Sequence, residues 1–145
     1  MKYRKGVFIV VYAKIGNGFE YLILKRQLHW KGWEFPKGGI ESGEKLVEVV
    51  KREVKEETGL MAKEIRNFKI TGSFKYGKRI KDRLGIIGQK YILFSAEVEK
   101  RKVNLKKNSD AEHSDFKWVN FEKALRLLTW PNQRRCLRIV NKFLN

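Results

Sequence analysis

Apolar and polar positions follow two different periods along the chain, and these periods predict its elements. Residues 6–14 are apolar and rich in β-branched side chains, which is typical of a strand. A second such run, residues 20–26, follows the turn sequence "IGNG", so we expect the two runs to form a β-hairpin. Further strands are expected at residues 62–76, 90–99 and 116–119.

Helical periodicity appears in three segments. The first, residues 44–58, begins after Ser42, which is a plausible N-cap, and ends at Gly59. The third begins after Pro131, a residue that favours the first turn of a helix. The two later helices span residues 121–128 and 132–144 and are amphipathic. Strands with helices packed on them predict an α/β protein with a mixed sheet.

The length of 145 residues predicts one domain, residues 1–145, because neither a linker nor a repeat interrupts the chain. No apolar run is as long as a membrane span, and the apolar start lacks a cleavage site, so a cytoplasmic protein without membrane contact is expected. The lone Cys136 excludes an intramolecular disulfide and a cysteine-rich zinc site. Two histidines, His29 and His113, are too few for a metal centre built on histidine alone.

The net charge is +17, with 33 lysines and arginines against 16 acidic residues. Such an excess favours polyanionic partners, namely phosphates, nucleotides or RNA. It fits equally well a heavily charged surface of the thermophile type, because lysine and glutamate are both plentiful. Composition alone leaves both interpretations open.

Two glutamates of the first expected helix lie where surface charges do not belong. At 100° per residue, the aliphatic side chains form one arc that must face the sheet. Glu53 and Glu57 lie within this arc, toward its C-terminal end, whereas the other charged positions lie opposite. The aliphatic arc consists of Leu46, Val47, Val49, Val50 and Val54, and the opposite side of Glu44, Glu48, Lys51 and Lys55.

This placement predicts a cation site. Carboxylates four residues apart repel each other and lose hydration when partly buried, and Glu56 and the helix C-terminus add negative charge. A divalent cation would balance this charge, and oxygen ligands without cysteine or histidine suit Mg²⁺ or Mn²⁺. The alternative is an ion-paired helix in which Arg52 and nearby lysines neutralise the glutamates.

The spacing of these residues resembles the signature of the Nudix hydrolases. Gly38 is followed by five residues, Glu44, seven residues and then "REVKEETGL", so all nine constrained positions match. The resemblance implies the Nudix fold, an α/β/α sandwich with a mixed sheet. It also implies a pyrophosphohydrolase that uses Mg²⁺ or Mn²⁺ to cleave a nucleoside diphosphate linked to another group.

The resemblance also implies a role for each residue. Glu53, Glu56 and Glu57 would hold the metals, and Arg52 would orient these glutamates by a charge-assisted hydrogen bond. Glu44 would support the turn into the helix and pair with Arg52. Gly38 and Gly39 would let the backbone approach metal and phosphate closely, with Gly38 as a further metal ligand.

Outside the signature, "WEFPKGGIESGE" and the tail at residues 112–144 resemble the diadenosine tetraphosphate hydrolases. The resemblance places Lys37 beside the phosphates and makes Glu112 an additional base or metal ligand, although Asp110 and Asp115 lie close by. A basic segment at residues 75–83 is the candidate for the polyphosphate chain, with a solvated loop as the alternative. The candidate phosphate contacts there are Lys75 and Arg79, and the candidate stacking residues for adenine are Tyr76, Tyr91 and Trp130, unless these aromatics belong to the core.

The favoured substrate is therefore diadenosine tetraphosphate, a small-molecule nucleotide polyphosphate, cut into ATP and AMP. An RNA 5′-end pyrophosphohydrolase is the main alternative, because "WEFPKGG" resembles those enzymes too and the positive charge suits RNA. An ADP-ribose or nucleoside triphosphate pyrophosphatase and a binding module without catalysis are further alternatives, the last opposed by the complete set of glutamates. Monomer and homodimer are both compatible with the sequence.

Overall fold

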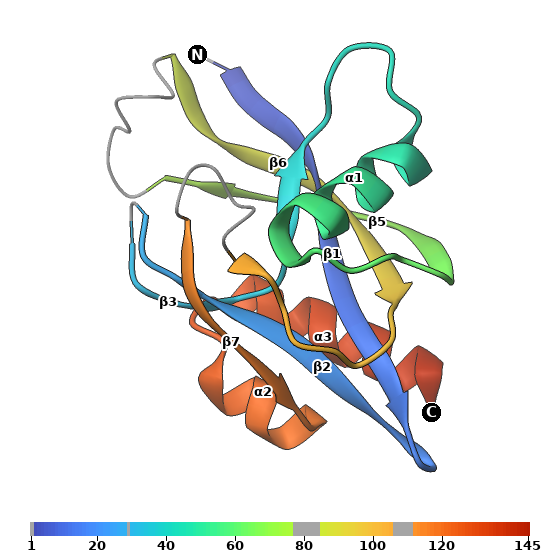
Figure 1. Cartoon of the computed structure of the whole chain (residues 1–145). Helices are drawn as coiled ribbons and strands as arrows, with labels where there is room; N and C mark the ends of the chain where they lie inside the picture. Colours follow the sequence, from blue (N-terminus) through green and yellow to red (C-terminus); the bar gives the residue numbers. More distant parts are fainter. Residues whose placement is uncertain (1, 29, 77–84, 106–111) are drawn as a thin grey trace.

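A seven-stranded mixed sheet forms the centre of this computed structural model, which describes residues 2–28, 30–76, 85–105 and 112–145 (Figure 1). β1 and β6 run parallel, and all other paired strands are antiparallel. The strand order is β3 (Gly32–Glu34), β2 (Gly18–Arg26), β1 (Lys2–Ile15), β6 (Ile86–Glu97) and β5 (Ile65–Lys75), while β4 (Lys37–Gly39) pairs with β1 and β7 (His113–Val119) with β2.

The expected hairpin is confirmed, because β1 pairs antiparallel with β2 and Ile15 lies opposite Gly18 across the turn. Gly16 has a φ of 57° in this turn, a conformation that glycine adopts without strain. Both faces of β1 are buried over residues 6–13, which explains the nearly continuous apolar sequence there.

Helices cover both faces of the sheet (Figure 1). On one face, Val49, Val50 and Val54 of α1 (Leu46–Thr58) pack against alternate residues of β1 and β2. On the other face, α2 (Phe121–Leu127) and α3 (Pro131–Leu144) contribute Ala124 and Leu137 to a second core. The predicted α/β/α sandwich is therefore confirmed.

The expected start of the first helix was wrong. The helix begins at Leu46, its N-cap is Lys45, and the Lys45 side chain makes no capping hydrogen bond. Ser42 lies instead within a turn, in which the N–H of Glu44 donates to the carbonyl of Glu41 at 3.2 Å. The expected end is confirmed, since Gly59 is left-handed with a φ of 77°.

Several strand boundaries also differ from those expected. β6 begins at Ile86 and β7 at His113, both earlier than predicted, and β5 begins later, at Ile65. β3 and β4 were not predicted, because three residues are too few to show a period. No helix in the described part of the chain is long and apolar enough to cross a membrane.

Candidate metal and nucleotide site

Glu53 and Glu57 are buried on α1, with exposed fractions of 8% and 6%. The helical pattern predicts this burial, because Glu53 and Glu57 lie on the same side of the helix as the valines that pack on the sheet. Glu56 lies outside the pair, with 58% of its side chain exposed. Two neighbouring buried carboxylates of one helix are costly unless something balances their charge.

β4 passes directly over these carboxylates. A Cβ added to Gly38 would lie 1.9 Å from Cδ of Glu53, so only glycine allows this approach. The backbone N–H of Lys37 donates a hydrogen bond of 3.2 Å to Oε2 of Glu57. The glycine-rich segment and the C-terminal half of α1 therefore form one structural unit.

Arg52 connects the loop before α1 to the helix. Its Nε and Nη2 donate to the two carboxylate oxygens of Glu44, at 2.9 and 2.8 Å, which confirms the predicted pair. Nη1 donates to Oε1 of Glu53 at 2.7 Å, and Nη2 also donates to the carbonyl of Gly39 at 3.1 Å. Hydrogen bonding from Arg52 lowers the pKa of Glu44 below its usual value.

Arg52 does not balance the buried pair. Burial raises the pKa of Glu53 to about 7, although the charge of Arg52 acts in the opposite direction. Burial, followed by the negative charges of Glu53, Glu112 and Glu34, raises the pKa of Glu57 well above its usual value. The ion-paired alternative therefore explains Glu44 but leaves Glu53 and Glu57 without sufficient positive charge.

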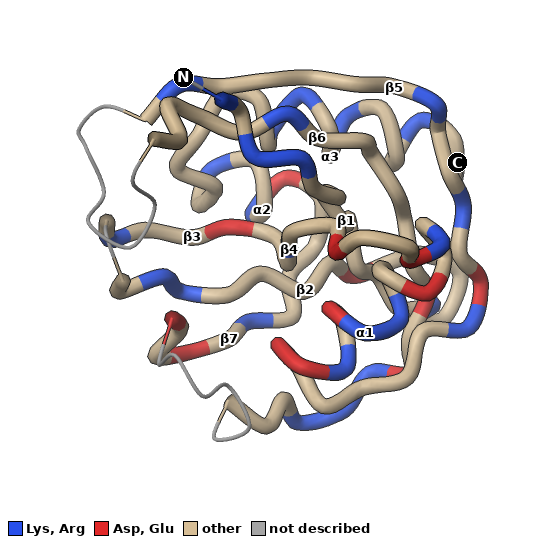
Figure 2. The backbone as a smooth tube through the Cα atoms, turned by 90° about the horizontal axis from the view of Figure 1, so that it is seen from above, with Lys and Arg blue, Asp and Glu red and all other residues tan. Residues whose placement is uncertain are grey.

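The start of β7 brings Glu112 to the same place. Oxygen and nitrogen atoms of Glu57, Glu112 and His113 all lie within 4.8 Å of one another. Of the two neighbouring acids, Asp115 is exposed and Asp110 lies outside the described residues. Figure 2 shows acidic segments on α1, β3 and β7.

Sequence reasoning missed a buried ionic group behind Glu112. Nη1 of Arg26 lies 3.0 Å from Oε2 of Glu34 and 3.6 Å from Oε2 of Glu112. Nε2 of His113 lies 2.8 Å from the same oxygen of Glu34. Burial opposes the ionisation of Glu34, but Lys37, the hydrogen bond with His113 and Arg26 outweigh it and hold its pKa at about 2. A glutamate in the apolar sequence "WEF" was the available signal, because a buried charge requires partners.

This donor set fits a divalent cation. Glu53, Glu57 and Glu112 present hard carboxylate oxygens, and burial raises the pKa of Glu53 and of Glu57 above the usual value. Carboxylates suit Mg²⁺ or Mn²⁺ better than softer metals. That Glu56 and Gly38 also bind the metal stays a prediction. The backbone of Gly38 lies directly against the carboxylate of Glu53.

An aromatic pocket of about 450 Å³ includes Lys37, which also contacts the carboxylate of Glu57. Lys37 joins the two, because its N–H binds Glu57 while its Nζ lies 4.8 Å from the ring centroid of Trp30. The rings of Trp30 and Trp130 meet edge to face with centroids 6.1 Å apart. The pocket is lined by Trp30, Lys37, Ser73, Phe74, Lys75, Tyr76, Trp130, Pro131, Asn132 and Gln133.

The expected substrate contacts divide between three places. Lys37, Lys75, Tyr76 and Trp130 line the aromatic pocket. Tyr91 does not, because it is only 4% exposed and its ring packs in the core at 5.4 Å from that of Phe8, which leaves no face for a base. The positions of Arg79 and of the lysines around it lie outside the described residues. Trp30 was missed, since its sequence context gives no sign of a pocket.

The chain is similar to known proteins over most of its length. A family model of the NUDIX domain matches residues 2–139. The chain is 32% identical over 128 residues to an RNA pyrophosphohydrolase of Haemophilus ducreyi, covering 82% of this chain and 63%, less than two thirds, of that protein. It is 29% identical over 164 residues to one of Bartonella bacilliformis, covering 100% of this chain and 94% of that one.

The fold is similar to that of a solved Caenorhabditis elegans Ap4A hydrolase binary complex, with a TM-score of 0.73, 23% identity and 97% of each chain covered. At this identity the likeness concerns the fold alone. The match of the domain model over nearly the whole sequence, together with the buried glutamates of the signature, shows that the chain belongs to the Nudix hydrolase family.

Proposed function

We propose that the protein is a metal-dependent pyrophosphohydrolase that cleaves a phosphoanhydride bond of a nucleotide carrying several phosphates. The observation that carries this proposal is the pair of buried carboxylates, Glu53 and Glu57, beneath the glycine-rich backbone at Gly38. Burial and the neighbouring carboxylates raise the pKa of both groups, and a bound cation would offset this cost of ionisation. The aromatic pocket beside them provides room for a base.

Each residue then has a defined task. Glu53, Glu57 and Glu112 would hold a divalent cation, which would neutralise phosphate charge and lower the pKa of the attacking water. Arg52 keeps Glu53 in place through its hydrogen bond of 2.7 Å. Glu112 is the candidate acceptor of the proton of the water, and Arg26 orients it from 3.6 Å away.

The aromatic pocket would hold the base of the substrate. Trp30, Tyr76 and Trp130 offer ring faces or edges, and such contacts accept any base. Lys37 and Lys75 bring positive charge to the same pocket, near the expected position of the first phosphates attached to the nucleoside. A base held there would place its nearest phosphates toward Glu57, because Lys37 contacts both the carboxylate of Glu57 and the ring of Trp30 in the pocket.

The 5′ end of RNA is the substrate that we favour. Relatives at 32% and 29% identity are RNA pyrophosphohydrolases, and these similarities cover most or all of this chain. The net charge of +17 suits the phosphate backbone of RNA. This order differs from the one expected from the sequence, which placed diadenosine tetraphosphate first.

Diadenosine tetraphosphate stays the second candidate. The loop "FPKGG" and the tail at residues 112–144 support it by their resemblance to enzymes of that group. Both candidates would place a base in the aromatic pocket and a phosphate chain at the carboxylates, so the arrangement of the site does not favour one over the other.

A hydrolysis panel tests the proposal. The protein is incubated with 5′-triphosphorylated RNA, diadenosine tetraphosphate, ADP-ribose and a nucleoside triphosphate, each with Mg²⁺ and with Mn²⁺, and every product is resolved. We expect the highest kcat/KM on the RNA, with a Glu57→Gln variant as the blank. A higher kcat/KM on diadenosine tetraphosphate would favour the second candidate. Absence of turnover on all four substrates would overturn the proposal and leave a nucleotide-binding module.

A further inference from the structure

Two neighbouring elements carry basic residues whose charge no acidic residue of the same elements offsets. β5 carries three basic residues and α3 carries four, and neither contains an aspartate or glutamate, although the whole chain has 16 of them. A surface charged only for solubility or thermostability mixes both signs. An unmixed positive face attracts a polyanion. These basic residues are Arg66, Lys69 and Lys75 of β5 and Arg134, Arg135, Arg138 and Lys142 of α3.

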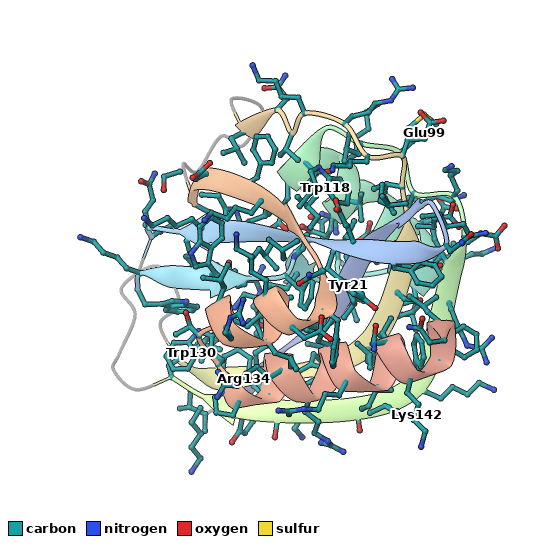
Figure 3. All side chains as sticks on the ribbon, turned by 90° about the horizontal axis from the view of Figure 1, so that it is seen from below. Tyr21, Glu99, Trp118, Trp130, Arg134 and Lys142 are labelled. Carbon is teal, nitrogen blue, oxygen red and sulfur yellow. The ribbon has the colours of Figure 1, made fainter. Side chains whose placement is uncertain are left out.

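β5 and α3 run side by side, and a hollow lies between them at each end. Figure 3 shows Trp130 and Lys142 at opposite ends of α3, with β5 alongside. The aromatic pocket of the proposed active site is at the Trp130 end and includes Phe74 and Lys75 of β5. A second hollow of about 460 Å³ lies at the Lys142 end. This basic–aromatic hollow is lined by Arg66, Asn67, Phe68, Lys69, Ile139, Lys142 and Phe143.

The basic–aromatic hollow presents a cation beside two aromatic rings, of which Phe143 is exposed and Phe68 is partly buried. Cζ of Arg66 lies 4.0 Å from the ring centroid of Phe143 and 5.6 Å from that of Phe68. The two rings meet edge to face at 5.5 Å, and Phe143 is 50% exposed. Aromatic and guanidinium planes of this kind stack on bases of single-stranded nucleic acid without requiring a sequence.

One stripe of α3 connects the two hollows. Asn132, Arg135, Ile139 and Phe143 follow one another at spacings of three, four and four residues, so they share one side of the helix. Asn132 lines the aromatic pocket, and Ile139 and Phe143 line the basic–aromatic hollow. The exposed Arg135 lies between them, so positive charge continues along the seam.

We propose that the seam between β5 and α3 is a binding track for single-stranded RNA, running from the aromatic pocket to the basic–aromatic hollow. The proposal rests on the RNA form of the proposed function, because it places the 5′ end at Glu53 and Glu57. The 14 residues of α3 span roughly 21 Å. A stacked strand at about 3.4 Å per nucleotide needs about six nucleotides to follow it.

Binding of RNA that lacks any 5′ phosphate tests the track independently of catalysis. A labelled 5′-hydroxyl single strand of about 12 nucleotides, twice the expected span, is titrated with protein at several salt concentrations and followed by fluorescence anisotropy. In Arg66→Ser/Lys142→Ser the slope of log K against log salt should fall by about 1.4, since each lost phosphate contact contributes about 0.7 on a single strand. Phe143→Ala should weaken binding about tenfold through lost stacking.

The matched control is Lys123→Ser/Arg126→Ser on α2. It also removes one exposed lysine and one exposed arginine, so the net charge of the two double variants is the same. The control should bind RNA like the unchanged protein. Thermal unfolding confirms that each variant is folded. Equal losses in both double variants would overturn the track, because they would indicate only an effect of overall charge.

Hydrolysis separates failure of the track from failure of the proposed function. The Arg66→Ser/Lys142→Ser variant should raise KM about tenfold for a triphosphorylated strand of about 12 nucleotides. The same variant should leave KM for a triphosphorylated dinucleotide unchanged. RNA hydrolysis without this length dependence would remove the track and keep the function. Seam-dependent binding without RNA hydrolysis would remove the function and keep the track. An acidic peptide that displaces the RNA and loses affinity in the same variants would assign the seam to a protein partner instead.

Discussion

The carboxylate of Glu53 and the α-carbon of Gly38 leave no room for a side chain between them. A Cβ on Gly38 would lie 1.9 Å from Cδ and 2.2 and 2.3 Å from the two oxygens of Glu53. Two segments fifteen residues apart therefore meet without an intervening group. The backbone of β4 therefore lies directly against the carboxylate of Glu53.

We expect Gly38→Ala to reduce kcat/KM about 100-fold, or about 2.7 kcal/mol of transition-state stabilisation, because Glu53 must leave its place. The matched control is Gly18→Ala, where the nearest atom lies 3.9 Å from the added Cβ and activity should be retained. Steady-state hydrolysis with each variant decides the point. Unchanged activity of Gly38→Ala would show that the position of Glu53 is unimportant.

Glu57→Gln should separate activity from stability. An amide is a poor cation ligand, so we expect kcat/KM to fall at least about 100-fold. The same variant should unfold at a higher temperature than the unchanged protein in the presence of a chelator. Burial raises the pKa of Glu57, so its charged form opposes folding at neutral pH, whereas the neutral glutamine carries no such cost.

Glu48→Gln is the control for this experiment, because Glu48 lies on the same helix with 63% of its side chain exposed. It should change neither activity nor unfolding temperature appreciably. If Glu57→Gln loses stability without metal, Glu57 is held by interactions other than the cation, and its assignment as a ligand is contradicted.

Metal binding should depend on pH through the buried carboxylates. The folded protein holds a proton on Glu53 up to about pH 7, whereas the unfolded chain releases it near the usual value of 4.5. In the metal-free protein, stability from this group is therefore lost as pH rises from about 4.5 to about 7. A cation must displace the protons, so Mn²⁺ should raise the unfolding temperature more at about pH 8 than at about pH 5.5.

Differential scanning calorimetry with and without Mn²⁺ measures this difference. A variant with both Glu53→Gln and Glu57→Gln should lose the stabilisation by Mn²⁺ at both pH values. Equal stabilisation of the unchanged protein across the pH range would mean that the cation binds elsewhere.

Trp130→Ala should weaken the binding of substrates that contain a base. Trp130 is 41% exposed and its ring meets that of Trp30, so the substitution opens the aromatic pocket without emptying the core. Loss of one stacking contact is worth about 1–3 kcal/mol, so KM for RNA should rise at least about fivefold. Inorganic tripolyphosphate, which has no base, is the control, and an equal rise in its KM would exclude stacking as the cause.

The centre of the site was predictable because it lies within one helix. Helical geometry fixes the angle between each residue and the next, so the buried sides of Glu53 and Glu57 followed from the valines around them. The pair of Arg52 with Glu44 was expected from the family resemblance and is confirmed.

The surroundings of the site were not predictable, because they depend on pairing between distant strands. Arg26, Glu34 and His113 meet only because β2 pairs with both β3 and β7. Tyr91 was misplaced for a related reason. Its strand, β6, is largely buried on both faces, so its sequence does not distinguish a residue of the core from one that faces a ligand.

The point of water attack can be tested on diadenosine tetraphosphate, whichever substrate is preferred. The aromatic pocket adjoins the carboxylates through Lys37, so a bound adenine would place its own proximal phosphate near Glu57. Glu112 must lie within about one water molecule of the attacked phosphorus to accept the proton. We therefore expect ATP and AMP as products, and hydrolysis in ¹⁸O water followed by mass spectrometry should find the label in AMP. Label in ATP would place the attack on the neighbouring phosphorus, and two ADP molecules would show a symmetric cut and contradict this placement of base and phosphate.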